Sequence, residues 1–336
     1  MALKSDTAWF REAKWGVFIH YLASPASSLG KSAMTVPEWN RRIDNFNAEQ
    51  LAGQLAEVGA GYCFLTLGQN SGFYLSPNST YDAIVGHEPS HCSRRDLVSD
   101  LHDALSRHGI KLLVYVTNTA PMQDEVAIEK LKCTPPWEDR DPLWCGLKVG
   151  DLKPLPGVDS RMTEFQHHWE AVIREWSLRW GRKVSGWWID GCYHPDLMYE
   201  FPDEPNFKSF IAALKAGNPD SIVSFAVKCG QPEFTTAYDD YTPGEINYLL
   251  PAPGRDAKFG GDINGAQYHI LTFMGEYWGA GTPRFSDALA VAWTREIIKH
   301  QGVVTWDVKV NGDGLINEAF FAQLHKIGKS AHGQCS

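Results

Sequence analysis

The sequence has no long uninterrupted run of apolar residues and no excess of positive charge. Its 336 residues contain 31 Lys and Arg against 40 Asp and Glu, which gives a net charge of −9. A membrane-spanning helix needs roughly 20 consecutive apolar residues, and no stretch reaches that length. Nucleic acids and anionic membrane surfaces need clustered basic residues, which are also missing. The sequence therefore predicts no membrane span and no nucleic-acid partner.

Several motifs that carry chemistry are also missing. The seven cysteines are scattered and form no Cys-x-x-Cys pair, so neither a zinc site nor a thioredoxin-like redox site is predicted. No glycine-rich nucleotide loop, no metalloprotease helix motif and no serine elbow occurs. The first residues lack the apolar region of a secretion signal. We expect a cytoplasmic protein that uses no metal or organic cofactor; a processed, secreted form and the oligomeric state are left open.

Tryptophan, in contrast, is abundant. The chain has 13 Trp, and 43% of its residues are hydrophobic, which is enough for a sizeable core. Most of these indoles are expected in that core. An acidic protein rich in Trp also suits sugar binding, because the flat C–H faces of a sugar ring pack against an indole. A few of the tryptophans are therefore predicted to line a binding site.

Short apolar runs alternate with amphipathic stretches along the chain, which is typical of parallel strands joined by crossover helices. We expect one domain over residues 1–336, an α/β fold of the (β/α)8, TIM-like barrel type. Fewer than eight strands are recognised, so closure of the barrel is inferred. Long loops at 119–158 and 236–264 are expected over the carboxyl ends of the strands, where barrel active sites form. The predicted strands are 15–20, 62–67, 111–117, 186–190, 221–227 and 302–306, and the predicted helices are 48–58, 97–107, 163–180 and 207–214.

The sharpest local feature is an aspartate at the end of a predicted strand. The run Trp187-Trp188-Ile189-Asp190-Gly191 puts a carboxylate at the strand tip, next to a glycine that permits a tight turn. Burial beside two indoles would alter the pKa of that carboxyl. Asp190 is therefore a candidate catalytic residue; the alternative is an Asp that caps the next helix or turn.

A second acidic segment lies between Tyr238 and Glu245. Its acids stand among Pro and Gly, where a solvated turn is the commoner outcome. A glycosidase needs two carboxyl groups, however, and Glu245 would serve as the acid/base if its loop folds over Asp190. The spacing between the two groups decides between retention and inversion, and the sequence does not give that spacing.

Polar residues also follow the first two predicted strands. His20 ends the first strand, and Gln69 and Asn70 follow the second. Amide groups donate and accept hydrogen bonds, which suits sugar hydroxyls, although amides are also common in turns and a lone His is often structural. All three are candidate substrate-binding residues.

The order of these features resembles glycoside hydrolase family 29, the α-L-fucosidases. The run Trp9 to His20 looks like the family's opening strand with its sugar-binding His, and Trp188 to Gly191 looks like the strand with the nucleophilic Asp. The pair Glu38-Trp39 resembles a pair that lines the fucose pocket, and Asp240 to Glu245 is similar to the stretch that carries the acid/base Glu. Weaker similarities are Arg95 to Val98, His108 to Leu112, Tyr277-Trp278-Gly279 and Gly312 to Gly314.

Three departures from the family stand out. Gln69 and Asn70 occupy the place of two adjacent His that contact sugar hydroxyls, and Lys228 stands where the family has an Arg near the sugar. An ammonium group does not reproduce the two-pronged contact of a guanidinium. The family's C-terminal β-sandwich has no counterpart in the sequence. Because the acid/base position varies in the family, Glu233 and Glu276 are reserve candidates to Glu245.

The resemblance implies a retaining exo-glycoside hydrolase that acts on α-L-fucosides or a closely related sugar. Asp190 would form the covalent glycosyl-enzyme, and Glu245 would serve as general acid and then as base. The substrate-binding residues would be His20, Glu38, Trp39, Gln69, Asn70, Lys228 and Trp278. Two alternatives stay open: a glycosidase of the same fold that is specific for a different sugar, and a catalytically silent carbohydrate-binding barrel.

Overall fold

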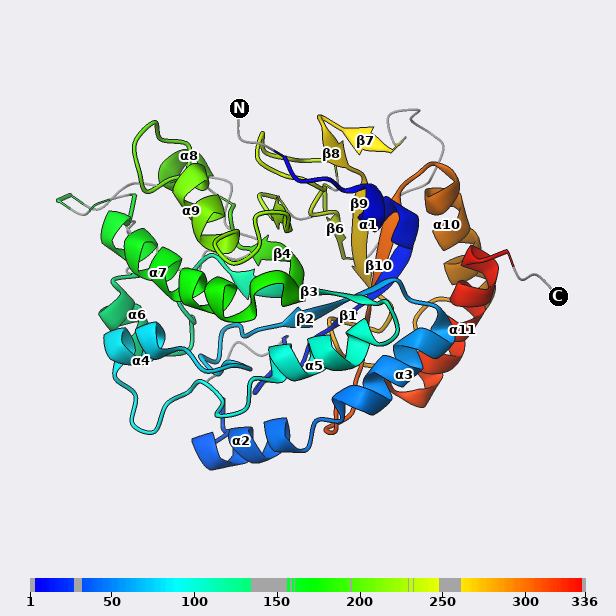
Figure 1. Cartoon of the computed structure of the whole chain (residues 1–336), viewed down its shortest axis with the longest axis horizontal. Helices are drawn as coiled ribbons and strands as arrows, with labels where there is room; N and C mark the ends of the chain where they lie inside the picture. Colours follow the sequence, from blue (N-terminus) through cyan, green and yellow to red (C-terminus); the bar gives the residue numbers. More distant parts are fainter. Residues whose placement is uncertain are drawn as a thin grey trace.

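A computed structural model of the chain describes residues 4–26, 32–133, 156–157, 159, 161–193, 195–228, 230–231, 233–247 and 261–333. In these residues, eight parallel strands form one curled sheet with helices packed around its outside, which confirms the predicted TIM-like α/β fold (Figure 1). The strands follow the spatial order β5-β4-β3-β2-β1-β10-β9-β6. Their bounds are β1 Trp15–Ile19, β2 Tyr62–Thr66, β3 Lys111–Thr117, β4 Val184–Asp190, β5 Ile222–Phe225, β6 Glu245–Ile246, β9 His269–Phe273 and β10 Val303–Val308.

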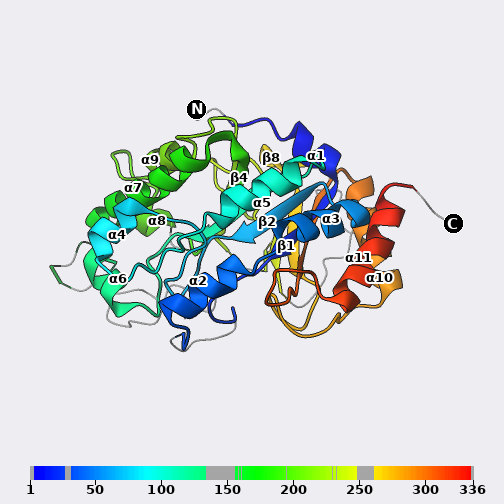
Figure 2. The same cartoon turned by 60° about the horizontal axis from the view of Figure 1, so that its bottom comes forward.

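The helices succeed one another around the outside of this sheet. Neighbouring helices pack together in the order α9, α7, then across η1 to α5, and on through α3 and α11 to α10 (Figures 1 and 2). No helix in the described parts of the chain is both long and apolar enough to cross a bilayer. The bounds are α1 Ala8–Ala13, α2 Val36–Asp44, α3 Ala48–Val58, α4 Ser79–Val85, α5 Leu97–Ser106, α6 Glu125–Leu131, α7 Thr163–Trp180, η1 Gly181–Lys183, α8 Pro195–Met198, α9 Phe207–Leu214, α10 Asp287–Lys299 and α11 Glu318–Ala331.

Alternation along each strand produces two separate cores. Side chains of one parity point into the barrel, where they form a mostly aromatic interior, and side chains of the other parity pack against the helices. In β4, for example, Trp188 belongs to the interior and Trp187 to the outer layer. The interior cluster contains Phe10, Phe18, Tyr62, Phe64, Leu113, Tyr115, Trp188, Ile222, Ala226, Tyr241, Leu271 and Val303.

The amino-terminal end of the barrel is closed by α1, the helix that precedes β1. Its Phe10 ring lies 4.7 Å from the ring of Tyr62 and 5.4 Å from that of His269, measured between centroids. Tyr62 and His269 are the first residues of β2 and β9, so Phe10 plugs the end at which the strands begin. The opposite, carboxyl end is the one left for a site, as in other barrels.

Strands β5 and β6 are the two edges of the sheet, and the gap between them, the seam, is bridged by the segment that precedes β6. The N–H of Asp240 donates to the carbonyl oxygen of Val223 in β5 at 2.9 Å, and the carbonyl of Asp240 accepts from the N–H of Gln267 at 2.9 Å. Gln267 belongs to a small antiparallel ribbon, β7 Asp262–Ile263 and β8 Ala266–Gln267. The segment before Glu245 therefore completes the barrel wall.

The predicted elements compare well with the observed ones, with a few differences. The helices predicted at 48–58, 163–180 and 207–214 and the strand at 111–117 have the observed bounds. The loop predicted at 119–158 is wrong in part, because it contains α6, whose first turn is capped by Asp124. The loop predicted at 236–264 is also wrong in part, because it contains β6 and the first strand of the ribbon, β7. Residues 134–155 and 248–260 of the two predicted loops lie outside the described residues. The elements that were not predicted are β6 to β9, α1, α2, α4, α6, α8, α10 and α11.

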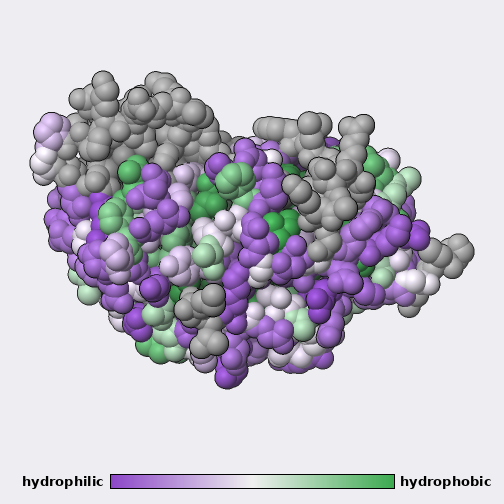
Figure 3. Space-filling view, turned by 90° about the horizontal axis from the view of Figure 1, so that it is seen from above, coloured by the Kyte–Doolittle hydropathy of each residue, from purple (hydrophilic) through white to green (hydrophobic). Residues whose placement is uncertain are grey.

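Most of the tryptophans are in the core, as expected. Nine of the described ones are buried: Trp15, Trp39, Trp169, Trp176, Trp180, Trp187, Trp188, Trp293 and Trp306. On the face seen from above in Figure 3, polar and charged residues cover most of the described surface, and apolar residues appear between them.

Candidate active site

A cavity of about 220 Å³ lies at the carboxyl ends of the strands. It brings together six of the predicted site residues, which come from five separate segments of the chain. The lining residues are Phe18, His20, Ala26, Gln69, Asn70, Tyr115, Trp188, Asp190, Tyr193, Glu245, Asn247, Leu271, Tyr277 and Trp278. A larger open groove of about 660 Å³ runs beside residues 44–49 and contains none of the predicted site residues.

Asp190 is the last residue of β4 and is buried, with 7% of its surface exposed. The hydroxyl of Tyr115 donates to its Oδ2 at 2.5 Å, and the hydroxyl of Tyr193 donates to its Oδ1 at 3.0 Å. Asp190 ends a strand and is not the N-cap of any helix whose cap the structure describes. Its carboxylate also accepts the N–H of Gly191, so one of its hydrogen bonds does cap the turn that follows.

The turn after Asp190 requires glycine. Gly191 has φ +86°, and a Cβ atom there would lie 2.4 Å from Oδ1 of Asn118. Asn118 in turn donates its backbone N–H to the carbonyl oxygen of Asp190 at 2.8 Å. The predicted strand–Asp–Gly arrangement thus holds the carboxylate at the strand tip, facing the cavity.

Glu245 begins β6 on the other side of the cavity. It is buried, and β6 pairs with β9. The preceding Gly244 has φ +67°, and a Cβ atom at this position would lie 2.0 Å from the carbonyl oxygen of His269, so the chain passes too close to β9 for any other residue. The indole of Trp188 donates to the carbonyl oxygen of Pro243 at 3.0 Å, which ties the Glu245 segment to the strand that carries Asp190.

The two buried carboxyl groups influence each other's protonation. Burial, and then the charge of Asp190, raise the pKa of Glu245 to about 8. Burial also raises the pKa of Asp190, but hydrogen bonds from Tyr115, Tyr193 and the N–H of Gly191 oppose that effect by stabilising the carboxylate. When the pair shares one proton, Glu245 is therefore the better place for it and Asp190 the better place for the charge.

The other acids of the segment before Glu245 have a structural role. Asp239 and Asp240 are buried rather than solvated. Asp239 accepts the N–H of Phe225 at 2.6 Å, and Asp240 accepts the N–H of Val223 at 2.9 Å. These carboxylates satisfy backbone groups of β5 where it lacks a neighbouring strand. Asp240 also pairs with the ammonium group of Lys215 at 3.0 Å.

His20 is fixed by an aspartate that the sequence analysis overlooked. Its Nδ1 lies 2.6 Å from Oδ1 of Asp307 in β10. The other oxygen of Asp307 accepts the N–H of Gly279 at 2.6 Å. The imidazole stacks on Phe18, with ring centroids 4.6 Å apart, and Trp278 lies 5.6 Å away. With Nδ1 occupied, Nε2 is the ring nitrogen left for a ligand in the cavity.

Gln69 reaches the nucleophile candidate indirectly. Its Nε2 donates to the hydroxyl of Tyr115 at 2.8 Å, and that hydroxyl donates to Asp190. Asn70 is anchored from behind, because its backbone oxygen accepts the N–H of Gln123 at 2.9 Å. The two amides that replace the family's His pair thus line the cavity in different ways, one engaged with Tyr115 and one held through its main chain.

Three predicted residues lie elsewhere, which corrects the expectation that they line the site. Glu38 is exposed on α2, where its carboxylate accepts the N–H of Thr35 at 2.8 Å in a capping box; these hydrogen bonds lower its pKa. Trp39 is buried and donates its indole N–H to the carbonyl oxygen of Tyr74 at 3.1 Å. Lys228 is exposed, with its ammonium group 3.6 Å from the ring centroid of Phe234.

The reserve acids are exposed and do not line the cavity; these are Glu233 and Glu276. The residues that the sequence analysis missed are Tyr115, Tyr193 and Asp307. Asp307 had a readable signal, since it lies near the end of an apolar strand, like Asp190. Tyr115 and Tyr193 had none, because a Tyr inside a strand or a turn is ordinary.

Comparison with known proteins gives a family and a fold for this chain. Residues 33–331 match the family model described as Alpha-L-fucosidase. None of the curated proteins compared matches the chain. The structure is similar to an α-L-fucosidase of glycoside hydrolase family 29 from Bacteroides thetaiotaomicron, solved as a trapped covalent intermediate with 2-fluoro-fucosyl fluoride. That match has a TM-score of 0.60 and 17% identity, and covers 98% of this chain and 75% of that chain.

Two further solved structures show the same fold. An endo-fucoidan hydrolase of glycoside hydrolase family 107 matches with a TM-score of 0.68 and 16% identity, over 96% of this chain and 53% of that chain. A mutant of the α-L-fucosidase AlfC, in complex with 4-nitrophenyl-α-L-fucopyranoside, matches with a TM-score of 0.59 and 13% identity, over 98% of each chain. Because the family model spans most of the sequence and the barrel agrees with it, this chain belongs to the α-L-fucosidase family, glycoside hydrolase family 29.

Proposed function

We propose that this protein hydrolyses terminal α-L-fucosides, or glycosides of a closely related sugar, with retention of configuration. Asp190 is the proposed nucleophile and Glu245 the proposed acid/base. The observation that carries the proposal is that two buried carboxyl groups from different strands face one cavity, and their surroundings favour a charged Asp190 and a protonated Glu245. That division of roles is what a two-carboxylate glycosidase needs.

In the first step, an oxygen of Asp190 attacks the anomeric carbon of the sugar, and the glycosidic bond breaks. Its electron pair passes to the leaving oxygen, which takes the proton of Glu245. Glu245, now ionised, then removes a proton from a water molecule. That water attacks the anomeric carbon and releases Asp190 from the glycosyl ester. The two steps together leave both carboxyl groups as they began.

The tyrosines support the nucleophile in this scheme. Tyr115 and Tyr193 hold one oxygen each, so the carboxylate keeps a fixed orientation before attack. As the ester forms, negative charge leaves Asp190 and these hydrogen bonds weaken. They strengthen again when the ester is cleaved, which favours the departure of the carboxylate in the second step.

The remaining lining residues would position the sugar. His20 offers the ring nitrogen that Asp307 does not occupy, and Asn70 offers an amide. Trp278 offers an indole beside the His20 ring, suited to the apolar face of a sugar. The cavity is floored by side chains of the barrel interior, Phe18 and Leu271, and its volume of about 220 Å³ suits one ring. A small site with a closed floor supports action on a terminal sugar.

The decisive experiment is hydrolysis of 4-nitrophenyl α-L-fucoside by the wild type and by Asp190→Gly, with and without azide. We expect turnover by the wild type, its loss in the variant, and partial recovery with azide as β-L-fucosyl azide forms in the space of the missing carboxylate. Glu276→Gln, which changes an exposed acid, is the matched control. Undiminished turnover in Asp190→Gly would overturn the assignment of Asp190 as the nucleophile. NMR of the first product formed shows whether the anomeric configuration is retained.

A different sugar is the second candidate, because Gln69 and Asn70 line the cavity in place of two His. The amide of Gln69 is already engaged with Tyr115, so the set of hydrogen-bond groups that meets the sugar differs from the family's. A panel of 4-nitrophenyl glycosides tests this candidate. Turnover of another glycoside above the fucoside, still abolished in Asp190→Gly, would change the substrate and keep the mechanism.

A further inference from the structure

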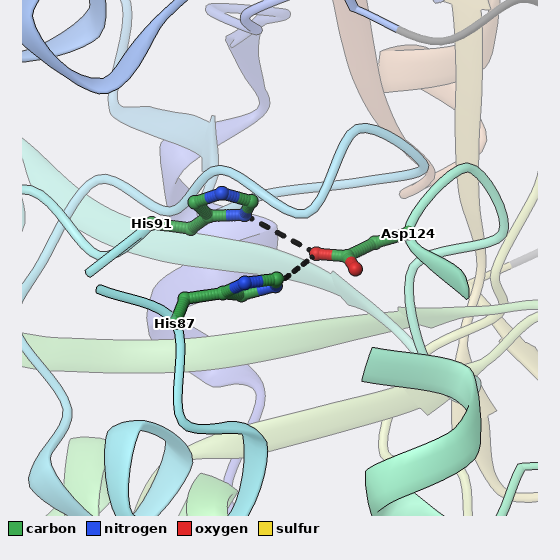
Figure 4. A group of neighbouring side chains, drawn as sticks. All are labelled: His87, His91 and Asp124. Carbon is green, nitrogen blue, oxygen red and sulfur yellow. Dashed lines mark hydrogen bonds and ion pairs between the residues drawn. The ribbon is translucent and has the colours of Figure 1, made fainter. Parts of the chain in front are cut away.

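A second cluster of polar side chains lies outside the cavity. His87 and His91 follow α4, and Asp124 lies in the turn before α6. Nε2 of His87 is 2.7 Å and Nδ1 of His91 is 3.2 Å from the same oxygen, Oδ2 of Asp124. Figure 4 shows both imidazoles pointing at this oxygen from one side. The two rings are stacked, with centroids 3.8 Å apart. Three ligand-type atoms therefore converge on one point.

We propose that His87, His91 and Asp124 bind a divalent transition-metal ion of the Zn²⁺ type, as a structural site beside the cavity. The inference is independent of the proposed hydrolase function and assigns the ion no part in that reaction.

The ligand set favours this class of ion. Two imidazole nitrogens and one carboxylate oxygen are ligands typical of zinc, whereas Ca²⁺ and Mg²⁺ prefer oxygen alone. All three atoms lie within 4.8 Å of one another. Zn–ligand distances of about 2.0–2.2 Å put tetrahedral ligands roughly 3.4 Å apart. The two nitrogen–oxygen separations, 2.7 and 3.2 Å, are close to that value, and the stacked imidazole rings would rotate apart to aim both nitrogens at one ion.

Only one oxygen of the Asp124 carboxylate is used to cap helix α6, and the other oxygen faces the histidines. Oδ1 of Asp124 accepts the N–H of Ala127 at 3.0 Å, as the cap of α6, so Oδ2 is the oxygen that turns to the histidines. Gly72 leaves the space beside it: a Cβ atom there would lie 2.7 Å from Oδ2. Any larger residue at 72 would displace the carboxylate.

The histidine segment is pinned as well. The carbonyl oxygen of His91 accepts the N–H of Tyr74 at 3.1 Å. Between the two histidines, Ser90 donates its hydroxyl to Asp82 at 2.6 Å and accepts the N–H of Cys92 at 3.0 Å. Ligands held by their own backbone contacts lose little freedom when an ion binds, which favours affinity.

Solvent can reach the cluster, so an ion has a way in and a water can complete its coordination. The side chains of His87 and His91 are 16% and 21% exposed, and that of Asp124 is 7% exposed. A metal here would join the segments that follow α4 and β3. It would also brace the cavity wall, since the N–H of Gln123, next to Asp124, donates to the carbonyl oxygen of Asn70.

The test is titration of metal-free protein with ZnCl₂, followed by calorimetry and by the melting temperature. We expect one tight site in the wild type, and a loss of affinity of more than about 100-fold in His87→Gln and in His91→Gln, since weaker, indirect contacts to a metal already account for 10–100-fold. Asp124→Asn keeps a good helix cap, so it tests the charged ligand without removing the cap. Zinc should raise the melting temperature of the wild type and not that of these variants.

The matched control is His102→Gln, which removes a partly buried His that also contacts an Asp, at 2.9 Å. Its zinc affinity should equal that of the wild type. Co²⁺ gives a second readout, because visible d–d bands typical of nitrogen and oxygen ligands should appear in the wild type and disappear in His91→Gln. The proposal is overturned if the wild type binds no zinc below millimolar concentration, or if its tight site survives in all three cluster variants.

Discussion

Strands β4 and β10 both carry an aspartate at or next to their carboxyl ends, and the two differ in what surrounds them. Asp190 accepts two tyrosine hydroxyls and lines the cavity. Asp307 accepts an imidazole nitrogen and a backbone N–H and sits behind His20, without lining the cavity. Burial raises the pKa of both. Burial at a strand tip therefore does not by itself indicate a catalytic acid. The distinguishing property is whether the carboxylate lines the cavity.

The same contrast occurs inside one segment. Asp240 and Glu245 are five positions apart and both buried, but Asp240 faces the seam of the sheet and Glu245 faces the cavity. Asp240 has a cation, Lys215, as its partner, whereas burial and the charge of Asp190 raise the pKa of Glu245. A pKa shifted by burial and a neighbouring like charge is typical of a reactive acid.

The largest effect is expected at Asp190. Asp190→Asn keeps the shape and removes the nucleophile, so kcat on the fucoside should fall by at least about 10³-fold, as when other enzymes lose theirs. Steady-state rates with 4-nitrophenyl α-L-fucoside measure this. Unfolding in urea should show little change, because the amide can still accept from one tyrosine. An unaffected kcat would mean that Asp190 is not the attacking group and would remove its contrast with Asp307.

Glu245 should show its role through leaving groups and pH. Loss of general acid catalysis costs about 10²–10⁴-fold, so Glu245→Gln should lose most on methyl α-L-fucoside, whose leaving group needs a proton, and less on the 4-nitrophenyl substrate. In the wild type the acid must be protonated. Activity should therefore fall as pH rises through about 8, the pKa to which burial and Asp190 raise Glu245.

The variant should lack this alkaline limb in a plot of kcat/KM against pH. An alkaline limb that is identical in Glu245→Gln would assign the acid to another residue.

A smaller effect is expected at Asp307. Asp307→Asn weakens its contact with Nδ1 of His20, so the ring orientation that faces the sugar is less well fixed. Losing the carboxylate partner of a metal-bound His typically costs 10–100-fold; by analogy we expect a loss of about this size here, chiefly in KM. Addition of azide should give no recovery, in contrast to Asp190→Gly. A loss confined to kcat, as large as that of Asp190→Asn, would place Asp307 in the chemistry and remove the distinction drawn here.

A substitution at Tyr193 tests the hydrogen bonds from tyrosine that Asp190 has and Asp307 lacks. Tyr193→Phe removes one donor, and a hydrogen bond to a charged group contributes about 1.5–3 kcal/mol. Cleavage of the glycosyl ester, the step in which this hydrogen bond strengthens, should therefore slow by up to roughly 10–100-fold. With one donor gone, the pKa of Asp190 rises further, and because the nucleophile must be ionised, the acidic limb of the pH profile moves to higher pH.

Tyr238→Phe, at a partly buried Tyr outside the cavity, is the control for Tyr193→Phe. An acidic limb that does not move in Tyr193→Phe would show that Tyr193 does not set the protonation of Asp190.

Local patterns, namely apolar runs and helical periods, were sufficient for the barrel class, and an acid followed by Gly was sufficient to place Asp190 at a strand tip. The proposed role of Asp190 came from the family resemblance. Asp307 has nearly the same pattern, and only its distance from the cavity distinguishes it. Strand β9 was missed because His269 and Thr272 interrupt its apolar run, although both are buried. Contacts across the barrel decide these cases, and no local pattern reports them.

Glu38 illustrates the opposite error. The run Thr35-Val36-Pro37-Glu38 has the spacing of a capping box, with Pro in the first turn, and the structure forms that cap. The local signal therefore favoured a structural Glu, and the resemblance to the family favoured a sugar contact. His87, His91 and Asp124 carried no signal at all, because Asp124 lies beyond the next strand of the chain and only the fold brings it to the histidines.

The smallest effect on activity is expected at Asp240, where the effect on stability should be large. Asp240→Asn leaves the ammonium group of Lys215, 12% exposed, without its carboxylate, and breaking a buried pair costs about 3–5 kcal/mol in unfolding free energy. Urea unfolding should show that loss, while kcat per folded molecule stays at the wild-type value because Asp240 faces the seam. Pairing Asp240→Asn with Lys215→Met removes both charges and should recover part of the stability. If Asp240→Asn instead lowered kcat in fully folded protein, the seam and the cavity would be coupled, and the division between structural and reactive acids in this segment would fail.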